Sequence, residues 1–248
     1  MTEKSLVILQ ARMSSKRFPG KIMQDVCGEP MIIRQINRIR CAKNVGKIIV
    51  ATTRDKSDDE FSSLMLSKKI DVYRGEIDDV ISRFVGILSK NQFSTVVRLT
   101  ADCPLVMADL IDRMIEEFVR TDYDYFSNTI TPTFPDGLDV EVFKRESLLC
   151  LSTLVLSKLE KEHVTLGFHN KKNNFKIQNF SSKRDYSNLR WTVDYPQDLE
   201  FVRIVYSHFR GLENTFGFKD VLDLIERNPT IKTSIPASLR NEALRENL

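Results

Sequence analysis

Short apolar runs alternate with amphipathic helical patterns in the first half of the chain, and this alternation constrains the fold more than any other feature. The runs with the composition of strands, rich in β-branched or aromatic residues, cover residues 6–9, 47–52, 70–73, 95–100 and 123–127. Helical patterns fill the gaps at residues 30–40, from residue 57 onwards, at 78–89 and at 108–120. Strands alternating with helices build a largely parallel sheet covered on both faces. We therefore predict a doubly wound, three-layer α/β/α sandwich.

The pattern changes at residue 129. Residues 129–137 hold two prolines and a glycine, which predicts a long loop, and such loops in compact domains are usually functional. Further strands are expected at residues 138–143, 175–180 and 189–193, and helices within 146–168 and at 196–209, 219–227 and 239–248. A length of 248 residues suffices for one substantial core, so we predict a single domain over residues 1–248.

Composition excludes several classes of protein. The 37 basic and 34 acidic residues are scattered, with no basic tract, so no nucleic-acid partner is expected. The apolar run at residues 5–9 is too short for a secretion signal or a membrane span, which predicts a cytoplasmic protein without membrane contact. The four cysteines form no C-x-x-C pair, so we expect reduced, mostly buried thiols rather than disulfides or a zinc site.

Four cations follow the first predicted strand within ten residues: Arg12, Lys16, Arg17 and Lys21. The carboxyl end of a strand borders the crevice in which α/β sheets bind ligands. A cationic loop with a glycine at this place suits a polyanion such as a triphosphate. The segment is not a P-loop, and no glycine spacing fits a dinucleotide fingerprint. A solvated surface loop is the alternative interpretation.

Two aspartates end predicted strands in the same manner. Asp102 follows residues 95–100 and Asp194 follows residues 189–193, each with a proline two positions later. Two carboxylates at strand ends can share Mg²⁺, whose remaining ligands are then phosphate oxygens and water. Aspartates before proline are also common turn formers, so each one alone leaves both interpretations open.

Other polar groups point less clearly to chemistry. Asp122 and Asp124 form a D-x-D unit like the metal motif of many nucleotide-sugar glycosyltransferases, but the unit precedes a strand and so lies at the wrong end for the crevice. The three histidines lack metal-ligand spacing, and a lone His163 is more often structural than functional. Cys103 has no histidine near it in sequence and is read as a packing residue.

A series of motifs then resembles a known family. It comprises RxxSxRxPGK at residues 12–21, GEPM at 28–31, YRGExDDVxxR at 73–83, RLTADCPL at 98–105, FPDGLDVEVF at 134–143, EHVT at 162–165 and WTVDYPxDL at 191–199. In this order, the motifs resemble cytidylyltransferases, namely the CMP-Kdo and CMP-N-acylneuraminate synthetases and above all their SpsF-like relatives. The resemblance covers roughly residues 5 to 205 and excludes the last forty.

The resemblance implies a mainly parallel, Rossmann-like sheet of the nucleotide-diphospho-sugar-transferase type. It also implies that CMP is transferred from CTP to an acidic sugar, or to a related phosphorylated or phosphonate acceptor, with release of pyrophosphate in polysaccharide or glycan biosynthesis. A homodimer formed through residues 129–185, which would also face the acceptor, is expected by the same analogy.

The site residues implied by the resemblance fall into three groups. Arg12, Lys21 and Asp102 would be catalytic, and Mg²⁺ would bind to Asp102 and Asp194. The further nucleotide-binding residues would be Leu9, Gln10, Ala11, Ser15, Arg17, Arg74, Asp79 and Arg83. The acceptor-binding residues would be Asn128, Asp136, Glu141, Glu162, His163 and Arg190. A nucleotide-sugar glycosyltransferase, a nucleotidyltransferase that uses another NTP and a non-catalytic binding module are the alternatives.

Overall fold

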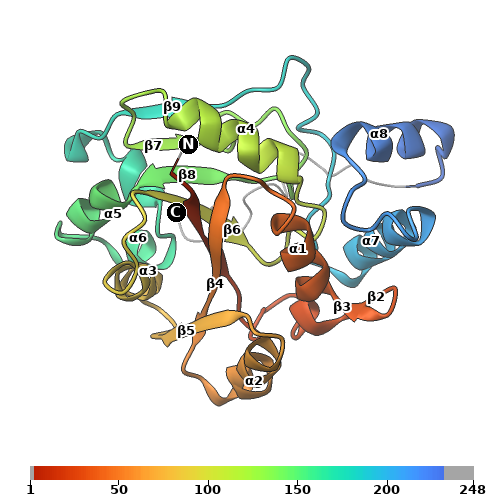
Figure 1. Cartoon of the computed structure of the whole chain (residues 1–248), viewed down its shortest axis with the longest axis horizontal. Helices are drawn as coiled ribbons and strands as arrows, with labels where there is room; N and C mark the ends of the chain where they lie inside the picture. The colour runs from red at the N-terminus through yellow and green to blue at the C-terminus, as the bar shows by residue number, and fades with distance from the viewer. Residues whose placement is uncertain (1–2, 232–248) are drawn as a thin grey trace.

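A seven-stranded sheet in the order β5-β4-β1-β6-β8-β7-β9 runs through the computed structural model, which describes residues 3–231 (Figure 1). The strands are β1 (Ser5–Gln10), β4 (Val45–Thr53), β5 (Asp71–Gly75), β6 (Thr95–Thr100), β7 (Tyr125–Ser127), β8 (Glu141–Lys144) and β9 (Ile177–Asn179). Neighbours from β5 to β6 are parallel, as are β7 and β9, whereas β8 is antiparallel to both β6 and β7. The prediction of a mainly parallel sheet is confirmed.

Helices cover both faces of this sheet because alternate residues of each central strand enter opposite cores. In β1, Val7 and Leu9 join one apolar cluster, and Leu6 and Ile8 join the other. The first cluster includes residues of α1 (Met31–Ile39), α2 (Asp59–Ser67), α4 (Ala108–Phe118), α7 (Pro196–His208) and α8 (Phe218–Arg227). The second includes residues of α3 (Val80–Leu88) and α5 (Arg145–Ser152), while α6 (Lys158–Glu162) lies against α3. The three-layer sandwich is confirmed.

Short elements complete the description. A small hairpin of β2 (Asp25–Val26) and β3 (Glu29–Pro30) precedes α1. The 3₁₀ turns are η1 (Lys21–Met23), η2 (Lys56–Asp58), η3 (Leu166–His169) and η4 (Lys171–Asn173). None of the helices within residues 3–231 is long and apolar enough to cross a lipid bilayer.

The second half departs from the sequence prediction in places. Residues 189–193 are not a strand: Arg190 forms an isolated bridge with Asp136, and the NH of Val193 donates to Asp102 O. The strand predicted at 138–143 begins at Glu141, because the amide of Asn128 takes the backbone groups that precede it. Cys41 and Cys150 are exposed, contrary to the expected burial, and all four cysteines are free. The helix predicted over 239–248 lies outside the described residues.

The topology fixes where a ligand can bind. The chain proceeds outward from β1 through β4 to β5 and then crosses back to β6, which pairs with the other edge of β1. The carboxyl ends of β1 and β6 therefore meet where the direction reverses, with Gln10 opposite Thr100. Loops that leave neighbouring strands in opposite directions at such a switch point open a crevice.

Candidate active site

The loop after β1 turns back on itself and places Lys21 beneath the strand ends. Gly20 adopts a left-handed conformation with a φ of 71°, which favours glycine, and its NH donates to Met13 O at 2.9 Å. The buried carboxylate of Asp58 accepts the NH of Met13 at 2.8 Å and also binds Thr52 and Thr53 at the end of β4. The loop is thus anchored near its start to the end of β4, and the bond from Gly20 to Met13 closes the loop on itself.

The ammonium of Lys21 joins the two strand-end carboxylates. Its Nζ donates to Asp194 Oδ1 at 2.9 Å, to Asp102 Oδ2 at 3.2 Å and to Val193 O at 2.7 Å. Burial alone would lower the pKa of Lys21, but the two carboxylates raise it above its ordinary value. For Asp102, burial opposes ionisation, but Lys21 and the Thr100 hydroxyl hold its pKa below the ordinary range. Lys21 and Asp102 are therefore both charged at neutral pH.

Asp194 is held from two further directions. Arg17 Nη2 lies 2.9 Å from its Oδ1, and Arg190 Nη2 lies 3.1 Å from its Oδ2. Arg190 also pairs with Asp136 at 3.4 Å and with Asp198 at 2.8 Å. The NH of Asp194 donates to Asp198 Oδ2 at 2.8 Å, at the start of α7. Arg190 thereby fixes the orientation of the Asp194 carboxylate through its Oδ2, while its Oδ1 faces Lys21.

Two adjoining cavities form the cleft at this switch point. The first, of about 290 Å³, is lined by Gln10, Ala11, Arg12, Ser15, Lys16, Arg17, Lys21, Ile22, Arg83, Thr100, Ala101, Asp102, Glu162, His163 and Asp194. The second, of about 310 Å³, is lined by Gln10, Arg98, Thr100, Asp102, Tyr125, Thr129, Asp139, Glu141, His163, Thr165 and Leu166. The shared residues Gln10, Thr100, Asp102 and His163 mark the boundary between the two cavities.

A polar network lines the second cavity. Arg98 donates to Gln10 Oε1 from Nε at 3.1 Å and pairs through Nη1 with Glu141. Tyr125 donates its hydroxyl to the other oxygen of Glu141 at 3.0 Å. At the boundary, burial lowers the pKa of His163, so its imidazole is neutral at pH 7. The second cavity thus offers hydroxyls, an amide and carboxylates, a set suited to a polyhydroxylated ligand.

The comparisons with known proteins agree with this architecture. A sequence model of the cytidylyltransferase family matches residues 6–219. The chain belongs to this family. It is 28% identical over 237 residues to the spore coat polysaccharide biosynthesis protein SpsF of Bacillus subtilis, covering 92% of this chain and 96% of that protein.

Two solved structures have folds similar to that of this chain. The chain matches a cytidylyltransferase from Leptospira borgpetersenii with a TM-score of 0.88 at 28% identity, covering 94% of this chain and 98% of that one. A CMP:2-keto-3-deoxy-manno-octonic acid synthetase complexed with CTP matches with a TM-score of 0.66 at 19% identity, over 83% of this chain and 99% of that one. The second likeness concerns the fold alone.

The structure brings most of the predicted site residues of this cytidylyltransferase together. The first cavity contains eleven of them: Gln10, Ala11, Arg12, Ser15, Arg17, Lys21, Arg83, Asp102, Glu162, His163 and Asp194. Glu141 lines the second cavity. Predictions made from strand ends and motif spacing therefore converge on one cleft.

Six predicted residues do not line the cleft. Leu9 is buried in β1, and Arg74 binds Thr53 O and Asp55 O at the end of β4. Asn128 bonds Leu138 O and the NH of Val140. Asp136 and Arg190 belong to the ion-pair group behind Asp194. All of these side chains engage protein groups instead of facing either cavity.

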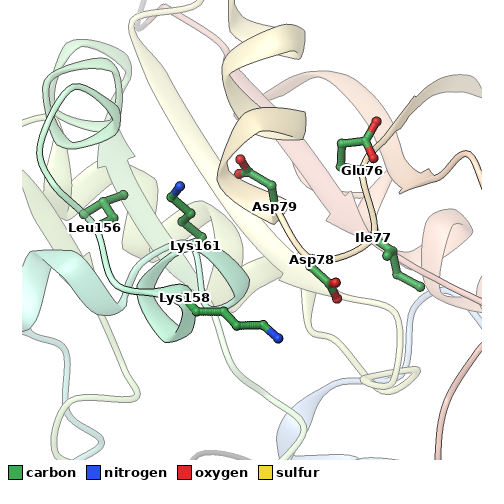
Figure 2. A pocket seen from close by; sticks show the side chains of 7 residues that line it. All are labelled: Glu76, Ile77, Asp78, Asp79, Leu156, Lys158 and Lys161. Carbon is green, nitrogen blue, oxygen red and sulfur yellow. The ribbon is translucent and has the colours of Figure 1, made fainter.

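Asp79 is the sixth. It accepts the NH of Ser82 at 3.0 Å and so caps the first turn of α3. It borders a separate cavity of about 360 Å³, which is lined by the 76–79 loop together with Leu156, Lys158 and Lys161. Asp78 and Asp79 of that loop lie across this cavity from Lys158 and Lys161 of α6, whereas Glu76 points away from them (Figure 2).

Sequence reasoning missed several lining residues, notably Arg98, Thr100, Tyr125 and Thr165. Arg98 and Thr100 carried a readable signal, because they are polar residues at alternate positions of a strand whose neighbours Val97 and Leu99 are buried. One face of the strand end is therefore polar. Tyr125 and Thr165 had no comparable signal, since their positions depend on how distant segments pack.

The two aspartates fit a shared magnesium ion. An oxygen of Asp102 and an oxygen of Asp194 lie within 3.2 Å and 2.9 Å of the same nitrogen of Lys21, so both converge on one cation position. Carboxylate oxygens are the hard ligands that Mg²⁺ prefers, with substrate phosphates and water as the others. No group of three histidine, cysteine or acidic ligands occurs among residues 3–231. The donor set therefore resembles a nucleotide-dependent Mg²⁺ site rather than an all-protein cage.

Proposed function

We propose that this cytidylyltransferase transfers CMP from CTP to an acidic sugar, or to a related phosphorylated or phosphonate acceptor, with release of pyrophosphate and with dependence on Mg²⁺. The observation that carries the proposal is the meeting of a cationic loop and two strand-end carboxylates in one cleft. The names of the relatives support CTP as the donor and polysaccharide biosynthesis as the context.

In the proposed reaction an acceptor oxygen attacks the α-phosphorus of CTP, and the bond from that phosphorus to the oxygen of the leaving pyrophosphate breaks. Arg12 and Lys16 line the first cavity without an ion pair to any residue in the described range, so they can bind the phosphates. Lys21 joins this loop to the carboxylates and can donate to either. When bound by Asp102 and Asp194, Mg²⁺ supplies positive charge to the nucleotide oxygens.

The second cavity is our candidate for the acceptor. It adjoins the first at His163, whose buried Nε2 has no hydrogen-bond partner among the described residues. A neutral imidazole between the two substrates can accept the proton that the acceptor hydroxyl loses. Glu141, Arg98 and Tyr125 hold one another in place beside it.

The glycosyltransferase alternative is disfavoured by the surroundings of its metal motif. Asp122 pairs with Lys144 at 2.8 Å and with Lys176 at 2.6 Å, and Asp124 accepts the hydroxyl of Ser147. These carboxylates precede β7 and line neither cavity of the cleft. The other alternative, a nucleotidyltransferase that uses a different NTP, is tested by comparing the four NTPs in the assay described next.

The test is pyrophosphate release with Mg²⁺, each of the four NTPs and a panel of sugar acids, sugar phosphates and phosphonates. We expect release that requires CTP together with an acceptor, and a product that contains CMP. Arg12→Ala and Asp102→Asn should remove most activity with the fold intact, whereas the distant Lys176→Ala should not. Release that never depends on an acceptor, or near-normal turnover of either site variant, would contradict the proposal.

The oligomeric state and the compartment complete the proposal. We propose a homodimer formed through residues 129–185 and a cytoplasmic location. Sedimentation of the pure protein at micromolar concentration should give twice the 28.7 kDa chain mass. A sedimenting mass equal to one chain would refute the dimer and leave the chemistry of the site unaffected.

A further inference from the structure

Asp58 is a buried carboxylate that the proposed reaction does not use. It ends η2 directly before α2, and its exposed fraction is 0%. An aspartate at this position usually caps the helix that follows, but within residues 3–231 this carboxylate makes no capping bond to α2. Burial of an ionised carboxylate is costly unless other groups donate to it, so its partners require an explanation.

The partners of Asp58 lie on two different segments. Its Oδ2 accepts the NH of Thr53 at 3.0 Å, the hydroxyl of Thr52 at 2.8 Å and the hydroxyl of Thr53, all at the end of β4. Its Oδ1 accepts the NH of Met13 at 2.8 Å, in the loop after β1. An ionised carboxylate accepts on both oxygens, whereas an amide accepts on only one. The charged form is therefore what joins the two segments.

The peptide group that Asp58 binds is the hub of the cationic loop. The NH of Met13 belongs to the peptide bond that follows Arg12. The carbonyl of Met13 accepts the NH of Ser15 and the NH of Gly20, each at 2.9 Å. Gly20 directly precedes Lys21, so both arms of the loop meet at Met13. One bond to Asp58 thus holds the segment that carries the cations of the first cavity.

The charge of Asp58 also acts on the first cavity. Burial and the nearby Arg12 lower the pKa of Arg83 to about 10, and Asp58 and Asp79 act on it in the opposite direction. Both arginines line the first cavity, whereas Asp58 does not belong to its lining. An anion behind the cavity wall attracts these cations without meeting an anionic ligand directly.

We propose that Asp58 is a positioning residue for anion binding, whose Oδ1 fixes the peptide between Arg12 and Met13 and so holds the cationic loop ready before the ligand arrives. The proposal rests on the proposed function, in which the first cavity receives the phosphates of the nucleotide. A loop that is ordered in advance does not lose conformational freedom on binding, which strengthens the binding of phosphate.

The first test is titration calorimetry of the whole protein with tripolyphosphate, comparing the wild type with Asp58→Asn. The single oxygen of the amide should stay with the donors of Thr52 and Thr53, so its NH₂ group would face the NH of Met13, donor against donor. We expect binding about 10-fold weaker, as for the loss of one hydrogen bond to a charged group. Arg38→Met is the matched control, because it also removes a buried charged side chain but lies outside the lining of both cavities.

The second test is brief trypsin treatment of the same proteins without ligand, well below the Tm. The loop offers cleavage after Arg12, Lys16 and Arg17, and mass spectrometry identifies the peptides that end there. Cleavage of a folded protein follows the population of its locally open forms. Asp58→Asn should be cut in this loop about 10-fold faster than the wild type, whereas Arg38→Met should be cut there at the wild-type rate.

The outcomes separate a positioning role from a merely structural one. Wild-type affinity of Asp58→Asn for tripolyphosphate would overturn the proposal, and so would an equal loss of affinity in Arg38→Met. Should Asp58→Asn fail to fold, Thr52→Val replaces it: it keeps the side-chain shape, removes one donor from the carboxylate and should show both effects at smaller size. Wild-type behaviour of Thr52→Val in both tests would then overturn the proposal. If the wild type itself does not bind tripolyphosphate, the phosphate site of the proposed function is refuted, and the cleavage rates alone test the bond from Asp58 to the loop.

Discussion

Replacing Arg190 by methionine should destabilise the protein strongly, although the motif resemblance placed this residue among those that bind the acceptor. Arg190 is 8% exposed, and its three nitrogens reach Asp136, Asp194 and Asp198 at 2.8 to 3.4 Å. Removing one partner of a buried ion pair costs about 3–5 kcal/mol. Asp194 keeps Arg17 and Lys21, and Asp198 keeps two backbone NH donors, so we expect a loss of about 3 kcal/mol.

This loss corresponds to a fall in Tm of about 6–12 °C for a chain of this size. The assay is thermal unfolding followed by circular dichroism, paired with steady-state kinetics. Arg190→Lys keeps the charge but loses the forked geometry, and should fall between the wild type and Arg190→Met. We also expect kcat to fall, because Asp194 loses its support. A variant with an unchanged Tm and a raised KM for the acceptor would refute the positioning role and support direct binding.

Three further predictions concern other parts of the molecule. Arg38→Met leaves three backbone carbonyls, two of them in buried hydrogen bonds, without their donor and should lower the free energy of unfolding by about 2–3 kcal/mol, as measured in urea. Gly137→Ala should cost about 2–4 kcal/mol, since φ is 108° and the new Cβ would lie 2.3 Å from Thr192 N; a normal urea midpoint would contradict this. Burial lowers the pKa of His163, so the unfolded chain binds more protons than the folded one just below pH 6.5, and stability should fall as the pH drops through that range. His163→Gln should make this fall shallower, and equal urea midpoints of the two proteins at each pH from about 7 to about 5 would count against it.

The parallel half of the sheet was predictable because its central strands, β1 and β6, are buried along most of their length. β1, β4 and β6 contain runs of β-branched residues, and amphipathic patterns between the strands predicted the crossover helices. The elements of the second half were harder to predict. There, side chains rather than neighbouring strands form hydrogen bonds with the backbone. The amide of Asn128 bonds residues 138 and 140, and so delays β8 in a way that no periodicity reveals.

The part of the site that could be predicted is the part formed by residues that directly follow strand ends. Arg12, Lys21 and Asp102 follow strands whose carboxyl ends share one edge, so their convergence needed little further information. Asp136 and Arg190 lie in matched motifs but face each other behind the cleft, and a motif does not reveal which side of a loop a side chain occupies. The bond from Lys21 to both carboxylates was likewise hidden, since it joins segments 81 and 173 residues apart.

The cations of the first cavity fall into two groups with different effects on binding. Lys21 and Arg17 are neutralised by Asp102 and Asp194, so the attraction for an anion must come from Arg12, Lys16 and Arg83. Lys16 is exposed, Arg12 is half-buried and Arg83 is buried, so the free positive charge extends from the rim to the interior. Salt screens exposed charges most and buried ones least. Added salt should therefore slow CTP association through the rim residues, whereas the contribution of the buried Arg83 to the local positive charge should persist at high ionic strength.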